Sequence, residues 1–211
     1  MIRKKIDFDK KHYYDEDVVK KQIYLHHTAG NSSGESVFQW WAQTPDRVAT
    51  FCAISGDGTV VQGFEPSKWA YHLGLGTKHF SEHKLKYTNL DRVSIGIEIC
   101  NWGQLTPDGT KFSTYTKRQI PSSEIIKLDQ PFKGYQYWHN YTDAQIDALE
   151  ELLCDLQGRF QIPLAVSGDL FSINKKAFLG EPGLYTHNSV RKDKTDIYPH
   201  PKLIEMLNRF S

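Results

Sequence analysis

One long amphipathic helix constrains the fold of this chain more than any other segment. It is predicted to begin after Thr142, because Thr142 and Gln145 form a capping box in which each side chain accepts a hydrogen bond from the other residue's backbone N–H. Apolar residues then follow at helical spacing at positions 146, 149, 152, 153, 156 and 160. The apolar face of such a helix has to pack against a second layer of structure.

Short apolar segments on both sides of this helix predict the strands of that layer. They are residues 22–27, 49–55, 59–64, 93–99 and 162–166. The second and third segments flank Gly56-Asp57-Gly58, a strong hairpin signal. The fourth alternates as V-S-I-G-I-E-I, which is typical of a central strand and leaves Glu98 on its less apolar face.

Two further helices are predicted over residues 35–43, capped by Ser33 or Ser36, and over residues 201–210. Strands interspersed with helices, with at least one hairpin, predict an α/β single domain in which a central mixed β-sheet is flanked by α-helices. Residues 103–140 are rich in Pro, Thr, Tyr and Lys without clear periodicity. We expect them to form a surface excursion within the one domain, residues 1–211.

Composition excludes several classes of protein. The 211 residues include 26 Lys and Arg against 25 Asp and Glu, and this balance argues against a nucleic-acid partner. No stretch approaches the roughly 18–20 apolar residues that span a bilayer, so no membrane insertion is expected. The charged N-terminus is not a secretory signal, which predicts a protein made in the cytoplasm without a signal peptide. Three cysteines without CxxC spacing predict small buried side chains, not a disulfide framework.

Histidines and acidic residues at two distant places could together carry chemistry. His26 and His27 end the first predicted strand, and only one of them can point to a given face of the sheet. His187 precedes Asp193 and Asp196 in a polar loop. Two imidazoles and one carboxylate would bind Zn²⁺ while leaving its fourth position open, as in catalytic zinc sites. Glu98 would then be a plausible general base, with Lys194 stabilising the oxyanion that forms on an attacked carbonyl.

Five motifs give the chain a resemblance to a known family. They are IYLHHTAGNS, ISGDGTVVQGFEPSKWAYHLG, SIGIEICN, YTDAQIDALEELL and THNSVRKDKTDIYP. In this order they resemble the type 2 N-acetylmuramoyl-L-alanine amidases, zinc enzymes related to phage lysozyme-type amidases and to peptidoglycan recognition proteins. The resemblance covers about residues 20–205 and implies the peptidoglycan-recognition-protein/amidase-like fold, with residues 1–211 as one zinc amidase domain.

The resemblance also implies a role for each matching residue. His26, His187 and Asp196 match the family's three zinc ligands, with Asp196 where many members have Cys. Lys194 matches the lysine that stabilises the tetrahedral intermediate, and Glu98 matches the acidic residue that polarises the zinc water. If Asp196 is not the third ligand, Asp193 is the next candidate and His200 a distant third.

The sequence departs from the family in two places. Thr50-Phe51-Cys52 replaces the Ser-His-Tyr or Ala-His-Tyr of relatives, which puts more weight on Glu98. Ile197-Tyr198-Pro199 replaces the Pro-Gly that usually follows the third ligand.

The substrate groove can be sketched from residues near these motifs. Trp69 and His72 correspond to the segment that borders the cleft in relatives, although Trp69 could equally be a core residue. Arg92, Asn101 and Arg191 are candidates for contacts with the stem peptide or the lactyl group, and the sequence does not select among them. Four further histidines are expected at the surface because they lie in polar, unpatterned contexts: His12, His79, His83 and His139.

These residues favour a zinc-dependent amidase that cleaves the bond between N-acetylmuramic acid and L-alanine in peptidoglycan. The alternatives are a non-catalytic peptidoglycan-binding recognition module and a zinc hydrolase of some other amide. The family resemblance and the missing signal further suggest a monomeric phage or prophage endolysin that acts on the bacterial cell wall after release.

Overall fold

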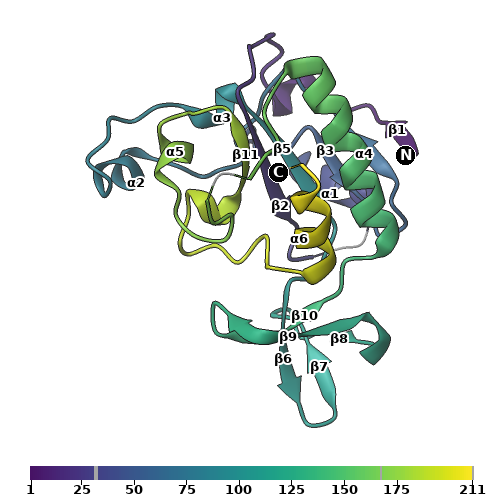
Figure 1. Ribbon diagram of the computed structural model, residues 1–211. Helices are drawn as coiled ribbons and strands as arrows, with labels where there is room; N and C mark the ends of the chain where they lie inside the picture. Colours follow the sequence, from purple (N-terminus) through teal and green to yellow (C-terminus); the bar gives the residue numbers. More distant parts are fainter. Residues whose placement is uncertain (31–32, 167, 211) are drawn as a thin grey trace.

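A six-stranded mixed sheet forms the centre of the structure, a computed structural model that describes residues 1–30, 33–166 and 168–210 (Figure 1). Its strands, in spatial order, are β1 (Arg3–Lys5), β4 (Val60–Gln62), β3 (Cys52–Ile54), β5 (Ser94–Ile99), β2 (Gln22–His27) and β11 (Gly183–Thr186). The four strands β3, β5, β2 and β11 run parallel to one another, whereas β4 pairs antiparallel with β3. The predicted mixed sheet and the predicted hairpin are therefore confirmed.

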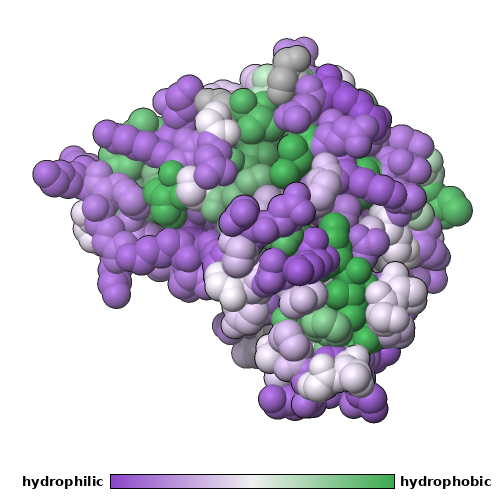
Figure 2. All heavy atoms as spheres, turned by 60° about the horizontal axis from the view of Figure 1, so that its bottom comes forward, coloured by the Kyte–Doolittle hydropathy of each residue, from purple (hydrophilic) through white to green (hydrophobic). Residues whose placement is uncertain are grey.

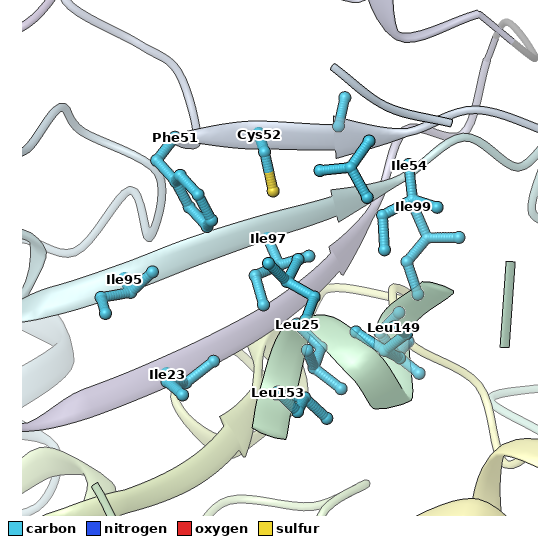
Figure 3. Packing of buried hydrophobic residues seen from close by; sticks show 14 of the residues in the cluster. Ile23, Leu25, Phe51, Cys52, Ile54, Ile95, Ile97, Ile99, Leu149 and Leu153 are labelled. Carbon is cyan, nitrogen blue, oxygen red and sulfur yellow. The ribbon is translucent and has the colours of Figure 1, made fainter. Parts of the chain in front are cut away.

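The apolar face of this sheet is covered by the helix that the capping box predicts. Helix α4 (Asp143–Phe160) has Thr142 as its N-cap, and the reciprocal bonds between Thr142 and Gln145 are both present. Its Leu149 and Leu153 lie against the isoleucines and leucines of β2 and β5 (Figure 3). Helix α6 (Pro201–Asn208) adds Leu203 to the same core. These contacts leave the other face of β2 and β5 for the remaining helices.

The opposite face carries the polar residues of the two central strands. Because side chains alternate along a strand, His26 and Glu98 lie on this face while Leu25 and Ile97 face α4. Helix α1 (Gly34–Trp41) lies on this side of β3 and β4, and α3 (Leu90–Val93) adjoins β5. Tyr24 of β2 belongs to a second hydrophobic cluster with residues of α2 (Thr77–Ser81) and α5 (Lys175–Phe178), which lie to one side of the sheet (Figure 1). Helix α1 begins at the predicted cap Ser33, whose hydroxyl accepts a hydrogen bond from the Ser36 N–H.

The predicted excursion folds into a second sheet that projects from the main body (Figure 1). Its strands, in spatial order, are β8 (Gln119–Ile120), β7 (Lys111–Ser113), β6 (Gln104–Asp108), β10 (Tyr135–His139) and β9 (Ile125–Phe132). Trp138 attaches it to the body, because its ring stacks on Tyr198 with centroids 4.6 Å apart. We call this five-stranded unit the small sheet.

Four local predictions were wrong. Residues 162–166 form no strand, although Ile162 and Leu164 are buried in the core. His12 and His139 are buried instead of exposed, and Cys154 is exposed instead of buried. His12 packs against Phe8, and His139 lies where the small sheet meets the body, so tertiary contacts bury both rings.

Single-turn helices complete the described chain. They are η1 (Lys10–His12), η2 (Ser122–Glu124) and η3 (His187–Ser189). Seen from the side of the small sheet, most of the surface is hydrophilic, with local apolar patches (Figure 2). Among the described residues, no helix combines the length and the apolar character needed to span a bilayer. Asn31 and Ser32, the last two residues of the first motif, lie outside the described residues.

Candidate metal centre and active site

Three neighbouring parallel strands bring the candidate residues to one edge of the central sheet. In the register of β2 and β5, His26 pairs with Glu98, so their side chains leave adjacent strands on the same face. Strand β11 pairs with β2 as far as Thr186, and His187 follows directly. The carboxyl ends of parallel strands are where α/β proteins commonly place their sites. Residues that are 161 positions apart in sequence, His26 and His187, therefore meet.

The three predicted metal ligands converge on one point. His26 Nδ1 lies 3.1 Å from His187 Nδ1 and 3.2 Å from Asp196 Oδ2, and His187 Nδ1 lies 2.9 Å from the same oxygen. In a tetrahedral zinc site with bonds of about 2.0–2.1 Å, ligand atoms stand about 3.3 Å apart. The observed triangle is only slightly smaller. Its geometry fits a metal ion bound by His26, His187 and Asp196.

Hydrogen bonds behind the two histidines direct their Nδ1 lone pairs to this point. The Nε2–H of His187 donates to the Leu73 carbonyl oxygen at 3.0 Å, so Nδ1 is the ring nitrogen that can offer a lone pair to a metal ion. His26 Nε2 lies 2.9 Å from His72 Nδ1, and His72 Nε2 lies 2.9 Å from the Ser94 hydroxyl. With Nδ1 of His26 turned to the metal, its proton sits on Nε2 and is donated to His72. Such outer partners fix the tautomer of metal-bound histidines.

Gly96 makes room for this arrangement. A Cβ at Gly96 would stand 3.0 Å from the His72 ring and 2.8 Å from Thr50 Cγ2, closer than real side chains approach. The glycine of the S-I-G-I-E-I strand thus allows His72 to lie flat on the sheet between His26 and Ser94.

Burial and charge hold two of the ligands, His26 and Asp196, in the forms that bind metal at neutral pH. Burial lowers the pKa of His26 to about 4, helped by the neighbouring His187, so the imidazole is neutral. Burial opposes ionisation of Asp196, but His187 and His26 outweigh it and hold the pKa of that carboxyl well below its usual range. A neutral imidazole at His26 and an ionised carboxylate at Asp196 are the forms that bind a cation.

Glu98 is a second carboxyl group beside this centre, and its pKa is shifted in the opposite direction from that of Asp196. Its side chain is buried, and it makes no hydrogen bond to any other described residue. Burial raises its pKa well above the ordinary value, Asp196 adds to the rise, and Lys194 opposes it. A carboxyl group whose proton affinity is raised in this way is suited to accept a proton from water. The charge of Lys194 lowers the pKa of both Glu98 and His26.

The alternative third ligands are engaged elsewhere. Asp193 forms a two-pronged ion pair with Arg191, at 2.8 and 2.7 Å, and is not among the atoms that converge with the two histidines. His200 pairs through Nε2 with Asn140 Oδ1 at 2.7 Å. Among the described residues, the structure therefore brings Asp196 to the two imidazoles and neither Asp193 nor His200.

The residues predicted for the groove are held within the protein. Trp69 is buried, stacks on Tyr14 with ring centroids 3.8 Å apart and donates to Glu16. Asn101 is buried and uses its amide to bind the backbone of residues 139, 140 and 103. Both ring nitrogens of His72 are used in the chain behind His26. These side chains thus have structural partners, and their contact with substrate stays a prediction, as does that of Arg191.

The small sheet contributes residues to the site that sequence analysis did not find. Lys133, in the turn between β9 and β10, donates from Nζ to the carbonyl oxygens of Lys192, at 2.8 Å, and Lys194. The Thr195 hydroxyl donates to Gln104 of β6 at 3.0 Å. The loop that carries Lys194 and Asp196 is thereby tied to the small sheet. No motif signals such a role, because Lys133 acts on main-chain atoms whose place depends on the folded loop.

Comparison with known proteins identifies the family. The family model described as N-acetylmuramoyl-L-alanine amidase matches residues 16–201. A search of curated proteins gives no match. Among solved structures, the chain is similar to the PlyG catalytic domain, with a TM-score of 0.57 and 17% identity over 100% of this chain and 93% of that one. It is also similar to PlyL, with a TM-score of 0.55 and 15% identity over 100% and 96% of the two chains.

A third similar structure is the E. coli amidase AmiD in complex with anhydro-N-acetylmuramic acid-L-Ala-D-gamma-Glu-L-Lys. The TM-score is 0.54 with 18% identity, over 93% of this chain and 59% of that one. At these identities the likenesses establish the fold, and the family model spans most of the sequence. The chain belongs to the N-acetylmuramoyl-L-alanine amidase family.

Proposed function

We propose that this protein uses Zn²⁺ to hydrolyse the amide bond between the lactyl group of N-acetylmuramic acid and the L-alanine that begins the peptidoglycan stem. The observation that carries the proposal is the convergence of His26, His187 and Asp196 within hydrogen-bonding distance of one another. Beside them lies the buried Glu98, whose carboxyl group has no hydrogen-bond partner among the described residues. The family and the muramyl-peptide bound by the similar AmiD support this substrate class.

In this reaction the residues of the site would bind the metal, transfer a proton and stabilise negative charge. His26, His187 and Asp196 would hold the zinc ion, which supplies a Lewis acid when bound. Glu98 takes a proton from the attacking water as its oxygen bonds to the amide carbon. Lys194 stabilises the negative charge that develops on the carbonyl oxygen. The C–N bond then breaks, the proton held by Glu98 passes to the leaving nitrogen, and the products are a lactyl carboxylate and a stem peptide with a free amine.

The proposal is tested by mass spectrometry of defined muropeptides incubated with the zinc-loaded protein, with and without a chelator. A free stem peptide that begins with L-alanine, and that disappears after chelation, is the expected result. Intact substrate in the presence of bound zinc would redirect the search to another amide. Intact substrate with no zinc bound would favour the recognition module.

The biological setting follows as a prediction from the family resemblance. A phage or prophage endolysin would accumulate in the host cytoplasm and reach the wall when the membrane is permeabilised. Detection of the protein outside intact, unlysed cells would contradict this role.

A further inference from the structure

One buried carboxylate lies behind both histidines of the candidate metal centre. Asp91 belongs to helix α3, which leads directly into β5, and its side chain is buried. Its Oδ1 accepts hydrogen bonds from two successive main-chain N–H groups, that of His72 at 2.7 Å and that of Leu73 at 2.8 Å. Asp91 therefore holds the backbone of residues 72–73 in place.

Each of these two residues carries the outer partner of one metal ligand. The His72 ring accepts a hydrogen bond from His26 Nε2 at 2.9 Å. The Leu73 carbonyl oxygen accepts one from His187 Nε2 at 3.0 Å. The two acceptors belong to adjacent residues, so a shift of this short segment would displace both of them. The hydrogen bonds of Asp91 thus support two ligands that come from different strands.

The ring of His72 is held from its other side by the same residue. Because His72 accepts a hydrogen bond at Nδ1, its own proton is on Nε2. That N–H donates to the Ser94 hydroxyl at 2.9 Å, and the hydroxyl donates in turn to the main-chain carbonyl oxygen of Asp91 at 3.4 Å. Each donor between His26 and Asp91 therefore faces an acceptor, and this order fixes the orientation of the His72 ring.

We propose that Asp91 is a positioning residue that aligns His26 and His187 for one metal ion. The inference rests on the zinc site of the function proposed above. Without the carboxylate, two buried N–H groups would lose their acceptor, and the backbone of residues 72–73 would move to reach another one. The imidazole and carbonyl acceptors would move with it. Because such outer partners orient metal-bound histidines, the two Nδ1 atoms would no longer converge.

The test measures the zinc affinity of the protein by competition with a chromophoric chelator. Asp91→Ala should lower this affinity about 10–100-fold, the range found for outer-shell partners. Asp91→Asn should stay within about threefold of wild type, because its amide oxygen can still accept both N–H bonds. If Asp91→Ala does not fold, Asp91→Glu takes its place. Glutamate keeps the charge but displaces the carboxylate by one methylene group, and the affinity should fall at least about fivefold.

Gln145→Ala is the matched control. Gln145 is as buried as Asp91, and its amide also bonds to two main-chain groups, the carbonyl oxygens of Ile54 and Cys100. It lies on helix α4, which covers the apolar face of the sheet. This variant should melt at a lower temperature than wild type and keep its zinc affinity within about twofold, which separates positioning of the ligands from general stability.

The connection to His187 is tested separately in a His72→Leu background. Leu73 holds His187 independently of the His72 ring, so adding Asp91→Ala should weaken zinc binding about three- to tenfold beyond His72→Leu alone. Equal affinity of the two variants would refute the joint role. An affinity of the single variant Asp91→Ala within about twofold of wild type would refute it as well, as would an Asp91→Asn variant as impaired as Asp91→Ala.

Zinc affinity is measured without turnover, so the two proposals can fail separately. If the wild-type protein binds zinc but cleaves no muropeptide, the hydrolytic proposal fails, and an effect of Asp91→Ala on zinc binding still supports the positioning role. If the wild-type protein cleaves muropeptide and Asp91→Ala binds zinc normally, only the role of Asp91 fails. Absence of zinc binding by the wild-type protein would overturn both.

Discussion

Removal of the His72 ring should weaken zinc binding although His72 does not touch the metal. In His72→Leu, the Nε2–H of His26 loses its acceptor at 2.9 Å in a buried setting. An unsatisfied buried donor costs about 1–3 kcal/mol. The tautomer of His26 with its proton on Nδ1 avoids the unsatisfied donor, but its Nδ1 then has no lone pair for the metal. We therefore expect zinc affinity to fall roughly 10–100-fold, the range found for outer-shell partners.

The assay is a competition titration of zinc against a chromophoric chelator, together with thermal unfolding of the metal-free protein to show that each variant folds. His72→Asn should recover part of the affinity, because its amide oxygen can replace Nδ1 as the acceptor. His200→Leu is the matched control, since it removes another buried histidine with one side-chain partner, Asn140, away from the metal ligands. A zinc affinity of His72→Leu within twofold of wild type would refute the proposed role.

Four further predictions concern the same centre. Glu98→Gln should retain zinc and lower kcat about 10²–10⁴-fold, the usual contribution of a general base; wild-type turnover would exclude that role. Lys194→Ala should also retain zinc, with kcat lowered about 10²–10³-fold in a muropeptide assay, and loss of metal would show that the assigned role is wrong. Chelation should lower the melting temperature by about 5–10 °C in calorimetry, because zinc at a hundred times its Kd contributes about 2.7 kcal/mol. Burial lowers the pKa of His27 to about 4. Between about pH 6.5 and pH 4 the unfolded chain therefore binds a proton at His27, whereas the folded chain keeps this imidazole neutral. The metal-free protein should thus lose about 2 kcal/mol of stability from this group between pH 7 and pH 5, as measured by urea unfolding, and His27→Phe should remove that share of the pH dependence.

The sequence predicts those parts of the fold that local patterns determine. Strand β2 has the predicted bounds, β5 begins one residue later than predicted, and α4 begins after Thr142 as expected. Each of these segments carries its own pattern of apolar residues or its own start signal. Residue chemistry and the family resemblance propose His26 and Glu98 for one site, but no local pattern predicts the parallel register that pairs them.

The remaining features depend on contacts that no local pattern encodes. The family resemblance favours Asp196 over Asp193 as the third ligand, but only the folded loop shows that Arg191 engages Asp193. The strands of the small sheet were not predicted because four of the five have five residues or fewer and many of their residues are exposed. In addition, a register shift between Tyr135 and Tyr137 breaks the alternation in β10. His72 lies in a motif of the family resemblance, but only the folded structure shows that its ring is directed to His26.

The two hydrogen bonds that the Lys133 ammonium donates to main-chain carbonyl oxygens have a consequence for protein engineering. A designer seeking a minimal amidase would be inclined to replace residues 104–139 with a short turn, because they lie outside the central sheet. That deletion would take away the ammonium group that ties down the carbonyls of Lys192 and Lys194. The loop that carries Lys194 and Asp196 would then lose this support, although the three candidate metal ligands would all remain in the chain. A truncated enzyme of this kind would need a new contact that holds the loop of residues 192–196 in place.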